Sequence, residues 1–268
     1  MNIINFLQYS FIQKAFFAGS FVAIVCSALG LFLVLRKMSL IGDGLSHVSF
    51  GAIALGLFFG VYPFYVAVPA VMLGSLLILK ISEKAKVYGD AAIGIVSAVG
   101  IAGGVILASL SKGFNVDLFS YLFGNILAIS TTEVILSIIL SFLVLAVLYF
   151  FYWDLFSATF DEEYAKTTGI KTNSINTLLT LLTAITVILS VKMVGVMLVS
   201  ALLILPAVTA LQLAKGFKTA IIFAAVFSLI SVISGITLSF FLDLPTGATI
   251  VMINVFFFGF VLIYKKLV

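Results

Sequence analysis

Long apolar runs separated by short polar connections constrain this sequence more than any other feature. The runs cover residues 15–35, 42–60, 62–81, 91–110, 131–152, 174–191, 195–213, 218–241 and 247–264. Each is close to the ~20 residues that a helix needs to cross the hydrocarbon core of a bilayer. The second and third runs, and the sixth and seventh, are joined so closely that one run of either pair is a candidate for a re-entrant segment. We therefore expect eight or nine transmembrane helices.

The composition excludes a soluble globular protein. Hydrophobic residues make up 63% of the 268 residues and charged residues only 9%, against about 25% charged residues in soluble domains. No long polar block interrupts the apolar runs, so residues 1–268 are expected to form one all-α, polytopic membrane domain in the lipid bilayer. The net charge of +4 does not indicate nucleic-acid binding, because its meaning depends on where the charges lie relative to the bilayer. Cys26, the only cysteine, is expected to be a buried small hydrophobe.

The distribution of basic residues predicts which loops face the cytoplasm. If Arg36 and Lys37 lie inside, alternation places the loops at 80–90, 161–171, 214–218 and 264–266 inside as well. Of the 14 Lys and Arg residues, only Lys14, Lys112 and Lys192 then lie outside. This excess on one side is the positive-inside pattern of membrane proteins. We expect a multi-pass protein of the bacterial plasma membrane with an outer N-terminus and a cytoplasmic C-terminus.

Two ionisable residues interrupt the second apolar run. They are Asp43 and His47, the latter being the only histidine of the chain. Four residues apart on a helix, they lie on one face, one turn from each other. His47 is ten residues past Lys37, which corresponds to about 15 Å of helix, near the middle of a hydrocarbon core about 30 Å thick. Ionisable groups at that depth are costly and by default mark the path of an ion or substrate.

The chemistry of this pair suits a divalent transition metal such as Zn²⁺ or Mn²⁺, because carboxylate and imidazole are both ligands for such ions. One chain supplies only two of these ligands, whereas a two-fold dimer with these helices at its axis supplies four. Gly42 and Gly44 flank Asp43 and are suited to unwinding the start of the helix, so that backbone carbonyls face a cavity. The alternative is structural, an Asp–His hydrogen bond that locks two helices together.

The segment 112–130 on the predicted outer face is aromatic and broken by glycines. We expect it to form a short helix lying at, or dipping into, the outer interface. Asp117, Phe119 and Asn125 are candidates for an outer gate or for contact with a partner, and a solvated loop is the alternative.

The segment 154–172 on the predicted inner face is the most polar stretch of the chain. Asp161 is expected to cap a short helix whose first turn carries Glu162 and Glu163. Gly169 is expected to end this helix, because glycine is common just past a helix C-terminus.

Other polar or unusual residues lie in or beside the apolar runs. Glu133 is expected only to favour the N-terminal dipole of its helix. Lys192 and Asp243 are expected to be interfacial charges at outer helix ends. Pro206 lies inside a run and is expected to kink it.

Three stretches resemble the membrane subunit of ATP-binding-cassette (ABC) importers for zinc and manganese, the metal-type permeases of bacteria. They are LVLRKMSLIGDGLSHVSFGAIALG (33–56), TFDEEYAKTTGI (159–170) and VGVMLVSALLILPAVTALQLA (194–214). The resemblance extends over nearly the whole chain. It implies a type II-like importer fold, a second permease copy, two cytoplasmic ATP-binding subunits, and an extracellular metal-binding protein that delivers the ion.

The resemblance also implies roles for particular residues. Asp43 and His47 line the metal path. The stretch 159–170 is the cytoplasmic coupling helix, in which Asp161, Ala165 and Gly169 match the spacing of an acid, a small residue and a glycine. Glu162 lies beside Asp161 in this helix.

The predicted cargo is zinc, with manganese as the alternative. The stretch SYLFGNILAIS (120–130) resembles zinc members more than manganese members. Two carboxylates and two imidazoles from a dimer suit four-coordinate zinc, whereas Mn²⁺ prefers more oxygen ligands. No resident cofactor is expected, and the metal is cargo.

Two other classes of protein compete with an ABC permease. The chain has no G-x-x-x-x-G-K-[ST] motif, so ATP hydrolysis is expected on a partner subunit and not here. A stand-alone secondary transporter driven by an ion gradient is the main alternative. An intramembrane aspartyl protease would need G-x-G-D, but Leu40 and Val87 occupy the first glycine position, so we do not expect an enzyme.

Overall fold

A computed structural model describes residues 8–85, 88–110, 121–122, 124, 129–196 and 198–267. In these ranges the chain is helical, with turns between the helices and no strand. The helices are α2 (Ser10–Leu35), α3 (Ile41–Phe58), α4 (Pro63–Lys84), α5 (Gly89–Leu110), α7 (Thr131–Phe150), α8 (Tyr152–Phe160), α9 (Glu162–Thr167), α10 (Thr172–Val194), α11 (Val199–Leu213), α12 (Phe217–Leu242) and α13 (Thr246–Leu267).

Within the described residues, eight helices are long and apolar enough to cross a membrane: α2, α3, α4, α5, α7, α10, α12 and α13. The expectation of an all-α membrane bundle with eight or nine spans is confirmed. The seventh predicted run is the short one, because α11 has only 15 residues. The sequence predicts that this run starts at residue 195, but α11 begins at Val199. The preceding helix α10 continues to Val194, and Gly195 ends it with a φ of 84°.

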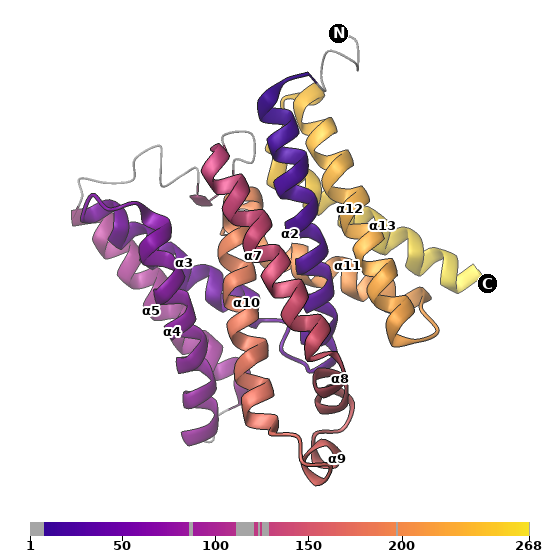
Figure 1. The fold of residues 1–268 in the computed structure, drawn as a ribbon. Coiled ribbons are helices and arrows are strands. Elements are labelled where there is room, and N and C mark those ends of the chain that lie inside the picture. Colours follow the sequence, from indigo (N-terminus) through magenta and orange to yellow (C-terminus); the bar gives the residue numbers. More distant parts are fainter. Residues whose placement is uncertain are drawn as a thin grey trace.

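Helices α3, α4 and α5 form a group on one side of the bundle, and we call them the α3–α5 unit (Figure 1). Glycines bring two of these helices into backbone contact. A Cβ atom at Gly51 of α3 would lie 2.5 Å from the Gly100 carbonyl oxygen, and one at Gly100 of α5 would lie 2.6 Å from the His47 carbonyl oxygen. Only glycine fits such an approach, so α3 and α5 are held together along their length.

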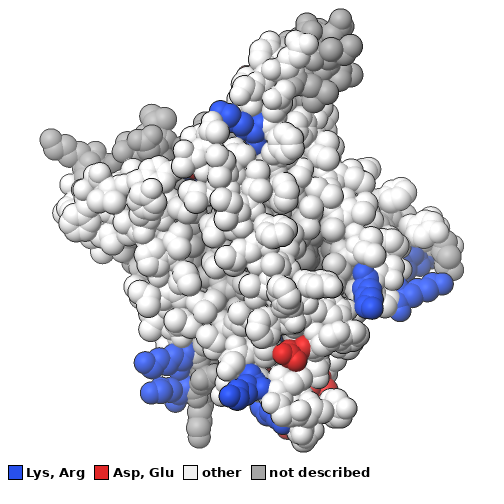
Figure 2. All heavy atoms as spheres, in the orientation of Figure 1, with Lys and Arg blue, Asp and Glu red and all other residues white. Residues whose placement is uncertain are grey.

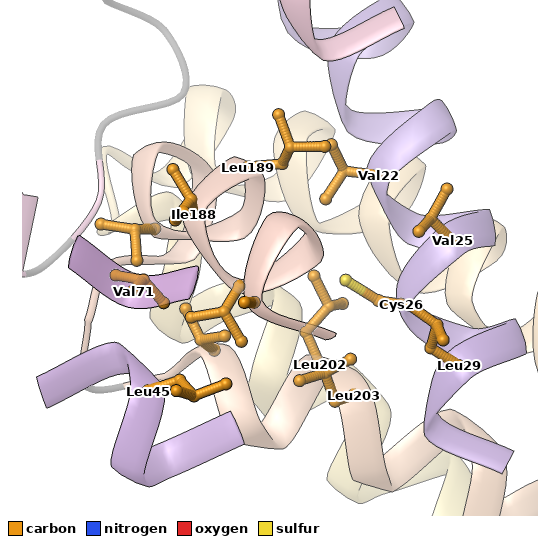
Figure 3. Packing of buried hydrophobic residues seen from close by; sticks show 14 of the residues in the cluster. Val22, Val25, Cys26, Leu29, Leu45, Val71, Ile188, Leu189, Leu202 and Leu203 are labelled. Atoms are coloured by element: carbon orange, nitrogen blue, oxygen red, sulfur yellow. The ribbon is translucent and has the colours of Figure 1, made fainter. Parts of the chain in front are cut away.

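The other helices pack around α2 and α10, with α12 and α13 on the far side from the α3–α5 unit (Figure 1). Here too a glycine allows close packing, since a Cβ atom at Gly30 of α2 would come within 1.8 Å of the Leu203 carbonyl oxygen of α11. Figure 3 shows the apolar core between the two groups, where Leu45 of α3 and Val71 of α4 meet Ile188 of α10. This core fixes where α3 stands in the bundle.

The single cysteine lies in this core, as expected. Cys26 of α2 is fully buried, and its Sγ lies 3.0 Å from the Oγ of Ser190 on α10 (Figure 3). Pro206 is likewise buried, inside α11.

Basic side chains gather at one end of the molecule. In Figure 2 most blue atoms lie at the lower end and lower right, around the ends of α4, α9, α12 and α13, and a smaller basic patch lies near the top. The described residues of the lower patches are exposed, and they include Lys80, Lys84, Lys166, Lys171, Lys215, Lys218, Lys265 and Lys266. This distribution agrees with the loop alternation that the sequence predicts.

Candidate functional site

Asp43 and His47 lie where the sequence predicts, one turn apart on α3. Asp43 belongs to the first turn of the helix. Its Oδ2 is 3.5 Å from Nε2 of His47, a distance that allows an ion pair but is long for a hydrogen bond. The Ser46 hydroxyl donates to the Asp43 carbonyl oxygen at 2.8 Å. The two side chains therefore point the same way along the helix.

The pair occupies the open side of α3. Gly42, on one side of Asp43, faces Leu203 of α11. Gly44, on the other side of Asp43, faces Ile93 of α5. The Asp43 side chain lies between these two directions and is 45% exposed, while that of His47 is 23% exposed. Both ligand candidates thus reach the surface of the single chain, Asp43 more than His47.

The described residues contain no cluster of three or more His, Cys, Asp or Glu side chains that could hold a metal ion. The pair itself is two donors, one oxygen and one nitrogen. The structural alternative, a hydrogen bond that locks two helices, does not hold within this chain, because both residues belong to α3. What the pair can do chemically is contribute half of a four-ligand site.

The polar inner segment folds as the sequence predicts. Asp161 is the N-cap of α9, and its Oδ1 accepts a hydrogen bond from the Tyr164 backbone N–H at 2.9 Å. Glu162 and Glu163 occupy the first turn, where carboxylates favour the helix dipole. Gly169 has a φ of 88°, a left-handed conformation that suits glycine just past the helix end.

The structure separates the buried and exposed faces of α9. Ala165 is completely buried against its own chain. Tyr164 beside it is 61% exposed, and Glu163 and Gly169 are also exposed. A partner that docks on α9 therefore meets Glu163 and Tyr164, whereas Ala165 holds the helix to the bundle. The sequence pattern could not make this distinction.

Arg36 links this inner segment to the start of α3. Its Nη2 donates to the Asn176 side-chain oxygen on α10 and to the Ala158 carbonyl oxygen on α8. Burial lowers the pKa of Arg36, and the negative charge of Glu162 on α9 partly offsets this effect. Arg36 is the C-cap of α2 and precedes the turn that leads into α3 at Ile41, so its side chain ties the chain just before α3 to α8 and α10.

Asp117, Phe119 and Asn125, the predicted outer-gate residues, lie outside the described residues. Parts of the same segment are described. The Tyr121 carbonyl oxygen accepts a hydrogen bond from the Val196 N–H at 3.0 Å. Gly124, with a φ of 74°, lies so close to Gly195 that a Cβ atom would be 2.5 Å from its nitrogen. Tyr121 and Gly124 therefore lie against the turn between α10 and α11.

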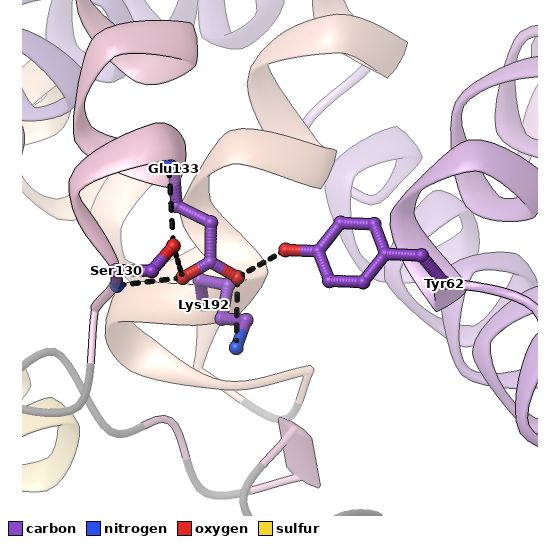
Figure 4. A network of polar contacts seen from close by, with 4 residues as sticks. All are labelled: Tyr62, Ser130, Glu133 and Lys192. Atoms are coloured by element: carbon purple, nitrogen blue, oxygen red, sulfur yellow. Dashed lines mark hydrogen bonds and ion pairs between the residues drawn. The ribbon is translucent and has the colours of Figure 1, made fainter.

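A polar network at the α4–α7–α10 end of the bundle was missed by sequence reasoning (Figure 4). Ser130 and Glu133 form a capping box at the start of α7. The Glu133 carboxylate also accepts a hydrogen bond from the Tyr62 hydroxyl at 2.5 Å and pairs with Lys192 Nζ at 3.1 Å. Lys192 Nζ lies 4.6 Å from the centre of the Tyr121 ring. Burial and then the hydrogen bond to Glu133 raise the pKa of Tyr62, so its hydroxyl stays protonated as a donor.

Glu133 and Lys192 therefore do more than favour a helix dipole or lie at an interface, because they join helices. The sequence does hold one signal for this cluster: STTE at 130–133 is a capping-box pattern. It predicts the Ser130–Glu133 contact. It carries no information about Tyr62 or Lys192, which lie 71 and 59 residues from Glu133.

Comparison with known proteins decides the family. The model of the ABC 3 transport family matches residues 8–265. The chain belongs to this family. The resemblance to metal-type permeases is confirmed, and the chain is a permease subunit of an ABC transporter and a multi-pass membrane protein.

Relatives in this family carry names for two metals. The chain is 35% identical over 247 residues to the manganese transport system membrane protein MntC of Halalkalibacterium halodurans, covering 92% of this chain and 85% of that protein. It is 33% identical over 251 residues to the high-affinity zinc uptake system membrane protein ZnuB of Haemophilus influenzae, covering 94% and 96%.

Solved structures agree with the fold. PsaBC from Streptococcus pneumoniae in complex with Fab matches with a TM-score of 0.87 and 32% identity, over 97% of this chain and 93% of that one. A putative metal-chelate type ABC transporter in an inward-facing conformation matches with a TM-score of 0.73 over 95% of this chain and 85% of that one. At 18% identity, the second match supports the fold alone.

Proposed function

We propose that this permease subunit imports a divalent transition metal, with zinc preferred over manganese, and that Asp43 and His47 are its metal ligands. The observation that carries the proposal is the geometry of this pair. An acid and an imidazole lie one turn apart on a membrane helix, on the side of α3 that faces out of the chain. Ionisable side chains such as these are costly inside a membrane and by default mark the path of an ion or substrate.

A second copy of the chain completes the site. With two-fold symmetry, the same surface of each copy meets the other, so two Asp43 carboxylates and two His47 imidazoles converge. This O₂N₂ set suits four-coordinate zinc, which has no geometric preference from its d electrons. Manganese prefers a larger, oxygen-rich shell. The names of the relatives support a metal and include both ions.

The transporter takes its energy from two cytoplasmic ATP-binding subunits and its metal from an extracellular binding protein. The polar helix α9, at the end of the molecule where basic residues gather, supplies the docking surface for the ATPase. By the positive-inside pattern this end lies in the cytoplasm, and the C-terminus with Lys265 and Lys266 lies on the same side of the plasma membrane.

The test is metal uptake by the complete transporter in proteoliposomes. Wild type should accumulate ⁶⁵Zn²⁺ with ATP, and faster than Mn²⁺. Asp43→Asn and His47→Gln should each lower uptake at least tenfold, because loss of a ligand weakens a site by about 10-fold or more. Asp90→Asn, which removes an exposed carboxylate from the first turn of α5, is the matched control.

Three results would overturn parts of the proposal. Normal uptake by both ligand variants would remove Asp43 and His47 from the path. Uptake of Mn²⁺ alone would reverse the choice of metal. Transport by the purified chain alone under a pH gradient would favour a secondary transporter.

A further inference from the structure

The polar network of Figure 4 joins two parts of the bundle. Tyr62 is the N-cap of α4 and belongs to the α3–α5 unit. Glu133 lies at the start of α7 and Lys192 in the last turn of α10, both outside that unit. The hydrogen bond from Tyr62 to Glu133 therefore fastens the α3–α5 unit to α7, and Lys192 adds α10 to the same carboxylate.

The packing beneath this network is incomplete. Two small cavities lie there, each with room for about one water molecule. Glu133 and Lys192 line the first, and Lys192, Tyr121 and Ser49 line the second. The Ser49 hydroxyl is buried on α3 and has no hydrogen-bond partner among the described residues. A buried, unpaired hydroxyl is unfavourable, so it subtracts from the stability that the apolar contacts give to the closed interface.

The contact between α3 and α5 is of the opposite kind. Gly51 and Gly100 bring those two backbones together with no room for a side chain. Because α3 and α5 touch through their backbones, they shift together, whereas the interface beneath the polar network contains two cavities and an unpaired hydroxyl. The α3–α5 unit is therefore the part that we expect to move as one body. Ser49 and His47 lie about 200° apart around the axis of α3, on nearly opposite faces of the helix. A shift of α3 at the Ser49 interface therefore also moves the Asp43–His47 pair on the opposite face.

We propose that Tyr62, Glu133 and Lys192 form a latch that holds the α3–α5 unit against α7 and α10, and that the latch opens to admit metal from the outer side. Glu133 is a positioning residue in this scheme. It touches no metal and acts through Tyr62 and Lys192 on where α3 stands. The proposal rests on the proposed function for the role of α3, but its evidence lies outside the Asp43–His47 pair.

The test measures access to the interface with a thiol. Ser49→Cys places a thiol in the cavity below the latch, in a Cys26→Ala background so that it is the only cysteine. The complete transporter, without ATP, is treated from the outer side with a membrane-impermeant maleimide. Labelling should be slow with the latch intact and about tenfold faster with Glu133→Gln or Tyr62→Phe, since each loses a hydrogen bond to a charged group.

Matched variants separate the latch from general damage. Lys192→Met should accelerate labelling, whereas Lys192→Arg should restore slow labelling, because arginine keeps both the ion pair and the contact with the Tyr121 ring. Asp243→Asn removes an exposed carboxylate at the end of α12 and should change nothing. Ile53→Cys, in the same cavity, replaces Ser49→Cys if that variant does not assemble.

The native thiol reports on loosening of the whole fold. Cys26 of α2 is fully buried against Ser190 of α10, and it lines neither of the two cavities. In a chain that keeps only Cys26, Glu133→Gln should leave labelling slow. Equal acceleration at Cys26 and Ser49→Cys, or no acceleration at Ser49→Cys, would overturn the latch. This readout needs no metal, so failure of the uptake assay and failure of the latch are distinguishable.

Discussion

Gly100 on α5 lies directly against the backbone of His47 on α3. A Cβ atom at residue 100 would be 2.6 Å from the His47 carbonyl oxygen, closer than such atoms approach in proteins. The position of the imidazole thus depends on the absence of a side chain on a neighbouring helix. This relationship couples helix packing to the Asp43–His47 pair and leads to a direct test.

Gly100→Ala should separate α3 from α5 and displace His47. We expect a loss of about 1–3 kcal/mol in stability from overpacking, together with lower metal uptake. Thermal unfolding in detergent and uptake in proteoliposomes measure the two effects. Gly94→Ala on the same helix is the control, because nothing lies within 4 Å of a Cβ atom there. Gly94→Ala should be neutral or stabilising by up to about 1 kcal/mol, and an equal loss in both variants would contradict the packing account.

The proposed dimeric site predicts the metal content of the purified permease. One ion should bind per two chains, since each chain contributes only Asp43 and His47. Elemental analysis after equilibrium dialysis with Zn²⁺ measures this ratio. His47→Gln should bind less than a tenth as much at the same free metal concentration. A ratio of one ion per chain in the wild type would mean that each chain holds a complete site of its own.

The exposed face of α9 predicts which residues meet the ATPase. Tyr164→Ala should weaken association with the ATP-binding subunits or uncouple ATP hydrolysis from uptake, because its side chain is 61% exposed. Co-purification and the ratio of ATP hydrolysed to metal imported are the measurements. Tyr88→Ala, with a side chain 91% exposed before α5, is the control.

Ala165→Leu should act differently from Tyr164→Ala. Ala165 is fully buried, so a larger side chain there should lower the thermal stability of the permease itself by about 1–3 kcal/mol. If Ala165→Leu instead left stability intact and released only the ATPase, α9 would have to dock through its other face.

Arg36→Met should uncouple the inner segment from α3. The substitution keeps length but removes the donors to Asn176 and to the Ala158 carbonyl oxygen, which then lose a charged partner worth about 1.5–3 kcal/mol. We expect ATP hydrolysis to continue with several-fold lower uptake. Lys37→Gln, which removes the adjacent exposed cation, should leave both rates unchanged. Equal losses of hydrolysis and uptake in Arg36→Met would indicate a purely structural role.

Much of this protein can be predicted from local sequence. Membrane-spanning helices follow from hydropathy, because the cost of a polar group in lipid is summed residue by residue along one helix. The α9 cap at Asp161 and its end at Gly169 were predictable for the same reason, since each involves contacts within a few residues. The i,i+4 spacing likewise brings Asp43 and His47 together on any helix.

The tertiary structure alone decided which faces these helices turn to one another. The sequence pattern made Ala165 a coupling residue and did not single out Tyr164, and only packing buried the first and exposed the second. Glu133 looked like a dipole partner until α4 and α10 brought Tyr62 and Lys192 to its carboxylate. Contacts between residues far apart in the chain depend on the relative placement of whole helices, which close glycine contacts set and no local pattern encodes.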